Sequence, residues 1–195
     1  MTALAKIQPK PAVEGTLREE RPIAIPHGGE HLTGSLALVP EPEALVLVAN
    51  DRGCGRHSAA ERELTAALRR EGFATVIVDL LLPDEAAKPA RAAWTRLQMQ
   101  ELARRIGSAR DWLSRRSEIG RLPLLLLGHG AGAGAAFLSA EARPAGLAGT
   151  LGCIGHPGAL DWTAIQRNGS APAPLLRRVL TALQRGAPTP HLRAG

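Results

Sequence analysis

The sequence predicts a three-layer α/β/α sandwich built on a mostly parallel sheet. Continuous apolar runs at 44–49, 73–78 and 122–127 have the composition of strands that are buried on both faces. Segments with helical spacing of apolar residues lie between these runs. Because strands that alternate with helices of this length are joined by parallel crossovers, the chain is expected to form a doubly wound layer structure.

The first half of the chain supplies a hairpin and two strands. Segments 21–25 and 32–39 flank the turn sequence His-Gly-Gly-Glu at 27–30, which predicts an antiparallel hairpin. The buried strand at 44–49 follows, and then an unusual loop at 50–57. Ser58 and Glu61 form a capping box that opens a helix, and Gly72 closes that helix. The strand at 73–78 ends at Asp79.

The second half continues the alternation. A loop with prolines is expected at 80–90, and a helix at 92–117 carries Leu102, Ile106, Ala109 and Leu113 on one face. The strand at 122–127 leads into a helix of small residues that reaches about residue 142, and a last strand lies near 147–154. Such a fold places any site at the carboxyl ends of the strands.

The length of 195 residues and the 45% hydrophobic content fit a single core. We therefore expect a flexible leader at 1–20, one domain at 21–162, and an irregular tail at 163–195 with one short helix near 175–183. The N-terminus lacks the apolar stretch of a signal peptide, and no run of 18 apolar residues exists. Two cysteines at unrelated positions indicate no disulfide framework and no metal site. These features predict a cytoplasmic protein without a membrane span.

The net charge of +6 invites a nucleic-acid role, but the charge pattern argues against it. The excess is nearly all arginine, spread along the expected helices with glutamate interleaved. Three Trp, two Phe and no Tyr offer little surface for stacking on bases. Solvated helix faces are the simpler interpretation.

The most informative motif is the turn between the strand at 122–127 and the helix that follows it. It reads Gly128-His129-Gly130-Ala131-Gly132. In a nucleophile elbow, G-x-S-x-G, the flanking glycines let the helix press against the strand, and a strained central residue presents its hydroxyl. Here the central residue is Gly130, which has no side chain to attack a substrate.

With this elbow, the N-terminal hairpin, the Arg56-His57-Ser58 loop and the strand ending in Val78-Asp79-Leu80, residues 21–162 resemble the α/β-hydrolases. Within that superfamily the chain is most similar to the small dienelactone-hydrolase-like group. The resemblance implies an α/β-hydrolase fold that is incomplete at its C-terminus, an activity related to ester or lactone hydrolysis, a small ester-like substrate and no cofactor.

Carrying the family roles onto this sequence exposes departures. The nucleophile position falls on Gly130, and the following amide, which helps to form the oxyanion hole, belongs to Ala131 and could survive as a donor. The loop that often begins His-Gly in such hydrolases begins Asn50-Asp51. A carboxylate at Asp51 would repel a developing oxyanion if it pointed inward. The remaining acid and histidine of a triad have no clear counterpart, because Asp161 and His191 lie in segments rich in Pro, Gly and Arg.

Other polar residues near the predicted cleft have plain explanations. His129 lacks a nucleophile to activate and is expected to point away from the elbow. Cys54 and Cys153 could each offer a thiol, but small packing residues are the simpler interpretation. Asp79 and His156 lie near the expected rim, where they are candidates for ligand contact.

We therefore expect a protein related to ester and lactone hydrolases that is catalytically impaired at Gly130. A noncatalytic domain that binds a ligand or a partner is the alternative. The glycines from 128 to 134 also fit a weak phosphate- or nucleotide-binding pattern, although no acid follows at the spacing that a dinucleotide fold uses. If the sheet ends near residue 154, its open edge favours a homodimer.

Overall fold

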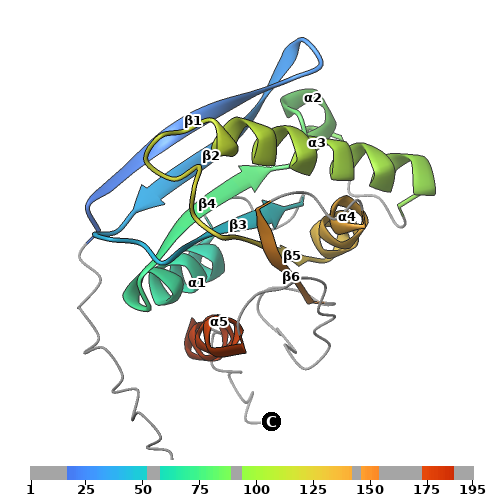
Figure 1. Cartoon of the computed structure of the whole chain (residues 1–195). Coiled ribbons are helices and arrows are strands. Elements are labelled where there is room, and N and C mark those ends of the chain that lie inside the picture. The colour runs from blue at the N-terminus through green and yellow to red at the C-terminus, as the bar shows by residue number, and fades with distance from the viewer. Residues whose placement is uncertain (1–16, 52–57, 89–93, 142–145, 154–172, 187–195) are drawn as a thin grey trace, which may run out of the picture.

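The computed structural model describes residues 17–51, 58–88, 94–141, 146–153 and 173–186, and it confirms the α/β/α architecture (Figure 1). The described strands are β1 (Glu19–His27), β2 (Glu30–Leu38), β3 (Ala44–Asn50), β4 (Phe73–Asp79), β5 (Leu124–His129) and β6 (Leu147–Cys153). The helices are α1 (Ala59–Arg70), α2 (Pro83–Ala86), α3 (Arg96–Ser114), α4 (Ala131–Ala140) and α5 (Ala173–Gly186).

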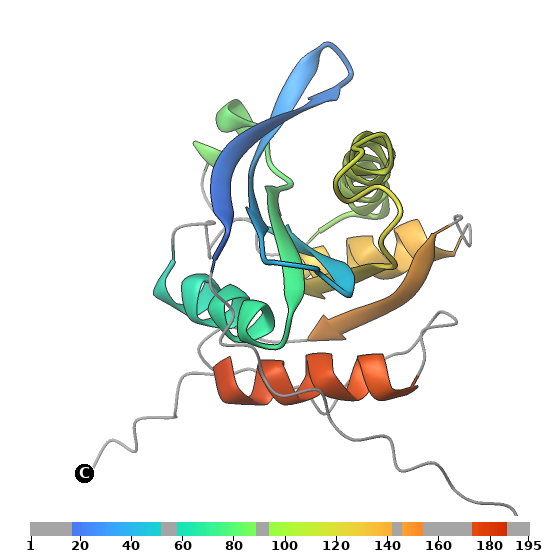
Figure 2. The ribbon, with the colours of Figure 1, turned by 60° about the vertical axis from the view of Figure 1, so that its left-hand side comes forward.

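The described strands form one sheet in the order β1-β2-β4-β3-β5-β6. Strands β3 to β6 are parallel, and β3 lies at the centre, where Leu47 pairs with Val76 of β4 and Leu126 of β5. The predicted hairpin is confirmed, and it adds two antiparallel strands at one edge. Gly28 and Gly29 both have positive φ, as the tight hairpin turn requires. The tip of the hairpin projects beyond the rest of the sheet (Figure 2).

The sheet is covered on both faces. On one face Val46 and Val48 of β3 pack with residues of α1 and α5, and on the other face Leu45 and Leu47 pack with residues of α3 and α4. Figure 2 shows these two helix layers on opposite sides of the strands. All seven residues of β3 are buried, which confirms the two-sided burial that its apolar sequence predicted.

Helix α5 has a larger role than the sequence indicated. The predicted division placed this helix in an irregular tail, but in the structure it packs against α1 (Figure 1). Leu176, Val179 and Leu183 of α5 are buried in the same core as the strands. Residues 173–186 therefore belong to the folded domain, and the leader is likewise shorter than expected, since β1 begins at Glu19.

Three local details differ from the sequence-based prediction. The short helix α2 lies within the segment expected to be a loop. Helix α3 begins at Arg96, because Thr95 caps it by accepting a hydrogen bond from the Gln98 amide. The Ser58 cap is confirmed, but the Glu61 carboxylate bonds to the Ser58 hydroxyl rather than to its amide. Across the described chain, no helix is both long and apolar enough to cross a membrane.

Candidate functional site

The turn from β5 into α4 has the backbone of a nucleophile elbow. Gly130 adopts φ 56° and ψ −128°, a region that residues with side chains enter only at a cost in energy. It is the N-cap of α4, and it lies at the carboxyl edge of the parallel strands. The elbow that the sequence motif predicted is therefore formed, with no side chain at its apex.

The glycines on either side of Gly130 bring α4 against the sheet. A Cβ atom added to Gly128 would lie 2.4 Å from the Gly132 carbonyl oxygen. A Cβ atom added to Gly132 would lie 2.3 Å from the Ala49 carbonyl oxygen. Real Cβ atoms do not approach carbonyl oxygens so closely, so only glycine allows this helix to begin where it does.

The amide after the elbow is already engaged. Asp51, which follows β3, turns its carboxylate toward the elbow, and Oδ2 accepts a hydrogen bond of 2.8 Å from the Ala131 amide. This is the amide that the family resemblance assigned to an oxyanion. A carboxylate is favoured at that place, because the amides at a helix N-terminus carry partial positive charge. Asp51 is therefore in the inward orientation that would oppose a second negative charge at this amide.

The Asp51 carboxylate also fills space at the elbow. A Cβ atom added to Gly130 would lie 2.8 Å from Asp51 Oδ2, which is closer than two such atoms can approach without a shift. The same oxygen thus meets both the Ala131 amide and the place where a nucleophilic side chain would begin.

A second polar group lies where β2, β3 and β4 meet. Asn50 is 1% exposed, and its Nδ2 donates a hydrogen bond of 3.1 Å to Asp79 Oδ1. Thr33 Oγ1 donates a hydrogen bond of 3.0 Å to Asp79 Oδ2. The buried Asn50 Oδ1 has no hydrogen-bond partner within the described part of the chain. The structure thus brings Asn50 to Asp79 and Asp51 to Ala131 at one edge of the sheet.

Several predicted site residues lie outside the described residues, namely Cys54, His57 and His156. His129 and Cys153 are register partners at the ends of β5 and β6, and only their backbones are described. The described residues contain no group of three or more His, Cys, Asp or Glu that could hold a metal ion.

The sequence interpretation did not identify Arg105, which fixes the chain after Asp79. Its side chain is 4% exposed, and it bonds to the Leu80 carbonyl and to both carboxylate oxygens of Glu85. Burial lowers the pKa of this guanidinium, but the hydrogen bond and the charge of Glu85, with Glu101, raise the pKa overall. The signal was present in the sequence, since Arg105 lies on the apolar stripe of α3 between Leu102 and Ala109.

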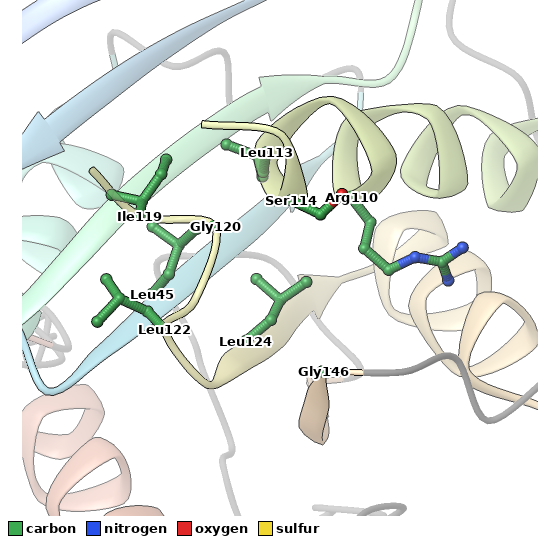
Figure 3. A pocket seen from close by; sticks show the side chains of 9 residues that line it. All are labelled: Leu45, Arg110, Leu113, Ser114, Ile119, Gly120, Leu122, Leu124 and Gly146. Atoms are coloured by element: carbon green, nitrogen blue, oxygen red, sulfur yellow. The ribbon is translucent and has the colours of Figure 1, made fainter. Parts of the chain in front are cut away.

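A pocket of about 50 Å³ lies at the opposite edge of the sheet (Figure 3). Leu45 and Leu124, near the starts of β3 and β5, line it together with Leu113 of α3. Arg110 also contributes, but its guanidinium points away from the leucine side chains (Figure 3). This small apolar pocket is therefore separate from the elbow, and it has no polar group arranged for chemistry.

The fold is that of the α/β-hydrolases. A dienelactone hydrolase from Anabaena variabilis superimposes with a TM-score of 0.62 and 28% identity, over 69% of this chain and 62% of that one. A cold-adapted esterase from an Arctic intertidal metagenomic library superimposes with a TM-score of 0.52 and 15% identity, over 78% of this chain and 65% of that one.

Among curated proteins, a "Putative phosphoribosyl transferase" from two strains of Mycobacterium tuberculosis is 31% identical over 129 residues. The match covers 66% of this chain and 28% of theirs, so the chain spans less than a third of the length of these relatives. No protein-family model matches the sequence.

Proposed function

We propose that this chain is a noncatalytic relative of the ester and lactone hydrolases, whose elbow binds a small neutral ligand and does not attack it. The hydrogen bond from the Ala131 amide to Asp51 Oδ2 is the observation on which the proposal rests. It adds a second obstacle to the missing nucleophile at Gly130.

The two obstacles act on different steps of ester hydrolysis. Without a side chain at residue 130, no covalent acyl intermediate forms at the elbow. With Asp51 on the Ala131 amide, a tetrahedral oxyanion would have to displace a carboxylate that the helix N-terminus already stabilises. Loss of one oxyanion donor alone costs about 10²- to 10³-fold in rate in serine hydrolases.

The charge at this edge of the sheet favours a neutral ligand. Asp51 and Asp79 place two carboxylates near the strand ends, and like charges in a partly buried site repel strongly. This argues against phosphate or nucleotide binding at residues 128–134, because the first amide of α4 faces a carboxylate. The phosphoribosyl transferase name comes from proteins of which more than two thirds lies outside the match, and we do not extend that activity to this chain.

One neutral lactone tests both parts of the proposal. Dihydrocoumarin is a substrate for lactone hydrolysis, and its product is an anionic carboxylate. We expect no turnover above the buffer blank, and we expect the lactone, but not the carboxylate product, to shift the Ala131 amide signal in nitrogen-proton NMR spectra. Turnover that Asp51→Asn or Cys54→Ala abolishes would contradict the noncatalytic assignment. Binding of the product in preference to the lactone would contradict the neutral ligand.

We also propose that the protein forms a homodimer through β6. Within the described part of the chain, β6 pairs on one side only, with β5, while Thr150 and Leu151 are buried. Its sequence, LAGTLGC, contains none of the charges or prolines that keep exposed edges from pairing. Two copies of β6 related by a twofold axis would continue the sheet.

Sedimentation and hydrogen exchange together test the dimer. We expect a monomer–dimer equilibrium, with slower exchange of the amides at 147–153 as the protein concentration rises. A monomer at every concentration, with unchanged exchange in that segment, would contradict the dimer. A cytoplasmic location remains part of the proposal, and fractionation of cells that express a tagged chain would test it.

A further inference from the structure

Three side chains outside the elbow form a hydrogen-bonded chain. His27 ends β1, while Glu101 and Ser108 both lie on α3, seven residues apart and so on one face of the helix. His27 Nδ1 lies 2.9 Å from Ser108 Oγ, and His27 Nε2 lies 2.8 Å from Glu101 Oε1. The His27 side chain is 16% exposed and that of Glu101 is 31% exposed, so the group is partly shielded from water.

The charges around Glu101 fix the direction of these hydrogen bonds. The hydrogen bond from His27 lowers the pKa of Glu101 most strongly, burial opposes it, and Arg104 and Arg105 lower it further. Arg104 Nε donates to Glu101 Oε2 at 2.8 Å, and Arg105 Nε donates to Oε1 at 3.3 Å. Glu101 is therefore an ionised carboxylate that only accepts hydrogen bonds.

The tautomer of His27 follows from that assignment. Because Glu101 Oε1 accepts, His27 Nε2 carries the proton that is donated to it. In a neutral imidazole Nδ1 then has a free lone pair, so the Ser108 hydroxyl donates its proton to Nδ1. A hydroxyl that donates to a base, which is in turn oriented by an acid, is the arrangement of an activated nucleophile.

A second serine on the same helix shows the usual alternative. Ser114 Oγ donates to the Asp111 carbonyl oxygen at 2.9 Å, which is the local bond that hydroxyls commonly make in helices. Ser108 instead bonds to the imidazole of a different element. Ser114 is thus a matched control, with the same residue type and the same helix but no bond to a histidine.

We propose that Ser108 is a nucleophilic site, separate from the elbow, in which His27 is the general base and Glu101 is the positioning residue that orients it. The site would accept small acyl groups from activated aryl esters, and phosphonyl groups from fluorophosphonates. The proposal does not depend on the function assigned to the elbow.

With 4-nitrophenyl acetate the steps balance as follows. Ser108 Oγ forms a bond to the carbonyl carbon, its proton passes to His27 Nδ1 and then to solvent, and the bond to 4-nitrophenolate breaks. In the second step water adds to the acetyl carbon, and His27 takes one water proton and passes it to Ser108 Oγ as the ester bond breaks. Acetic acid is released and ionises.

The reaction is expected to be slow. The amides in the middle of α3 are engaged in the helix, so they do not form an oxyanion hole for Ser108. General-base assistance alone contributes about 10²- to 10⁴-fold. Covalent labelling is therefore a better measurement than turnover.

The test uses the full-length protein and a biotinylated fluorophosphonate, with the labelled peptide identified by mass spectrometry. We expect the label on Ser108, no label on Ser114, and no label at 108 in Ser108→Ala. His27→Gln removes the base, and we expect labelling to slow by about tenfold or more, since general-base assistance is lost. Ser114→Ala is expected to label at the wild-type rate.

Glu101→Gln leaves the imidazole in place but removes the charge that sets its tautomer, so labelling should also slow. If His27→Gln loses its far-ultraviolet circular dichroism, Glu101→Gln decides the question. No label on Ser108, or equal labelling of Ser108 and Ser114, would overturn the proposal. So would an unchanged rate in a folded His27→Gln protein. Lactone turnover that is lost in Ser108→Ala but retained in Asp51→Asn would belong to this site and not to the elbow.

Discussion

Asp51 and Gly130 compete for one space, because the Asp51 Oδ2 atom that accepts the Ala131 amide lies 2.8 Å from where a Cβ atom of residue 130 would stand. The residue missing from the elbow and the carboxylate present there are therefore a single structural arrangement. Glycine at 130 admits the carboxylate, and the carboxylate in turn stabilises the first turn of α4.

Removal of the Asp51 carboxylate should expose a binding site for anions. In Asp51→Ala the Ala131 amide loses a charged partner, and we expect a loss of about 1–2 kcal/mol in the free energy of unfolding, measured with urea. The freed helix N-terminus should then bind phosphate, so that phosphate raises the melting temperature more in the variant than in the wild type. Asp111→Ala removes an exposed carboxylate that bonds to Arg110, and it is the control. Equal effects of phosphate on both variants would argue against the exposed amide.

A serine placed at the elbow should destabilise the protein. Gly130→Ser adds the cost of a positive φ and a close contact with Asp51, and we expect a loss of about 2–4 kcal/mol. Combining it with Asp51→Ala should cost less than the sum of the two single changes, because the close contact disappears. Gly107→Ser, at a helical position with open space around its Cβ, is the matched control and should stay near the wild-type stability. Strict additivity would refute the shared space.

The approach of α4 to the sheet should tolerate no methyl group. We expect Gly132→Ala to lose about 3 kcal/mol or more, since its Cβ would lie 2.3 Å from the Ala49 carbonyl oxygen, a backbone atom that cannot move aside alone. Gly107→Ala should be stabilising by about 0.5–1 kcal/mol, because alanine favours a helix interior. Chemical denaturation of both variants measures the difference. Similar stabilities would mean that α4 does not lie this close to β3.

Arg105 and its neighbour Arg104 should differ sharply in their effect on stability. Arg105→Met leaves Glu85 without its buried partner, and we expect a loss of about 2–4 kcal/mol. The Arg104 side chain is 69% exposed, so Arg104→Met should change the stability by less than about 0.5 kcal/mol. Urea unfolding of the two variants gives the comparison, and equal losses would contradict the structural role of Arg105.

Glu101 should make the protein sensitive to acid. Its pKa in the folded state is below the ordinary carboxyl value, chiefly because of the His27 hydrogen bond. A group with a lowered folded pKa stabilises the protein above its unfolded pKa, and that stability is lost as the pH falls through the folded pKa. Stability should therefore fall less steeply below about pH 4.5 in Glu101→Gln than in the wild type. Urea midpoints between pH 3 and pH 7 measure it, and parallel profiles would contradict the assignment.

The sequence alone predicted most of the framework. Strands β3, β4 and β5 are short apolar runs between clear helix signals, and Gly72 and Gly130 mark backbone turns that only a few conformations satisfy. The start of α3 was missed by four residues, although Thr95 and Gln98 form a capping box that could have located it.

The contacts between distant residues were not predictable in this way. Asp51 and Ala131 are 80 positions apart, and whether the carboxylate turns inward depends on how β3 and β5 align. His27 was interpreted only as part of a turn, because nothing in a local pattern connects it to a helix more than 70 residues later. The burial of α5 likewise depends on α1, from which about 100 residues separate it.

The competition between residues 51 and 130 also has a historical consequence. A lineage that carries this pair cannot regain an elbow serine by one substitution without instability, and losing the aspartate first leaves a helix terminus without its cap. Each single step back is selected against, so the pair acts as a ratchet that keeps a once-catalytic scaffold available for other uses.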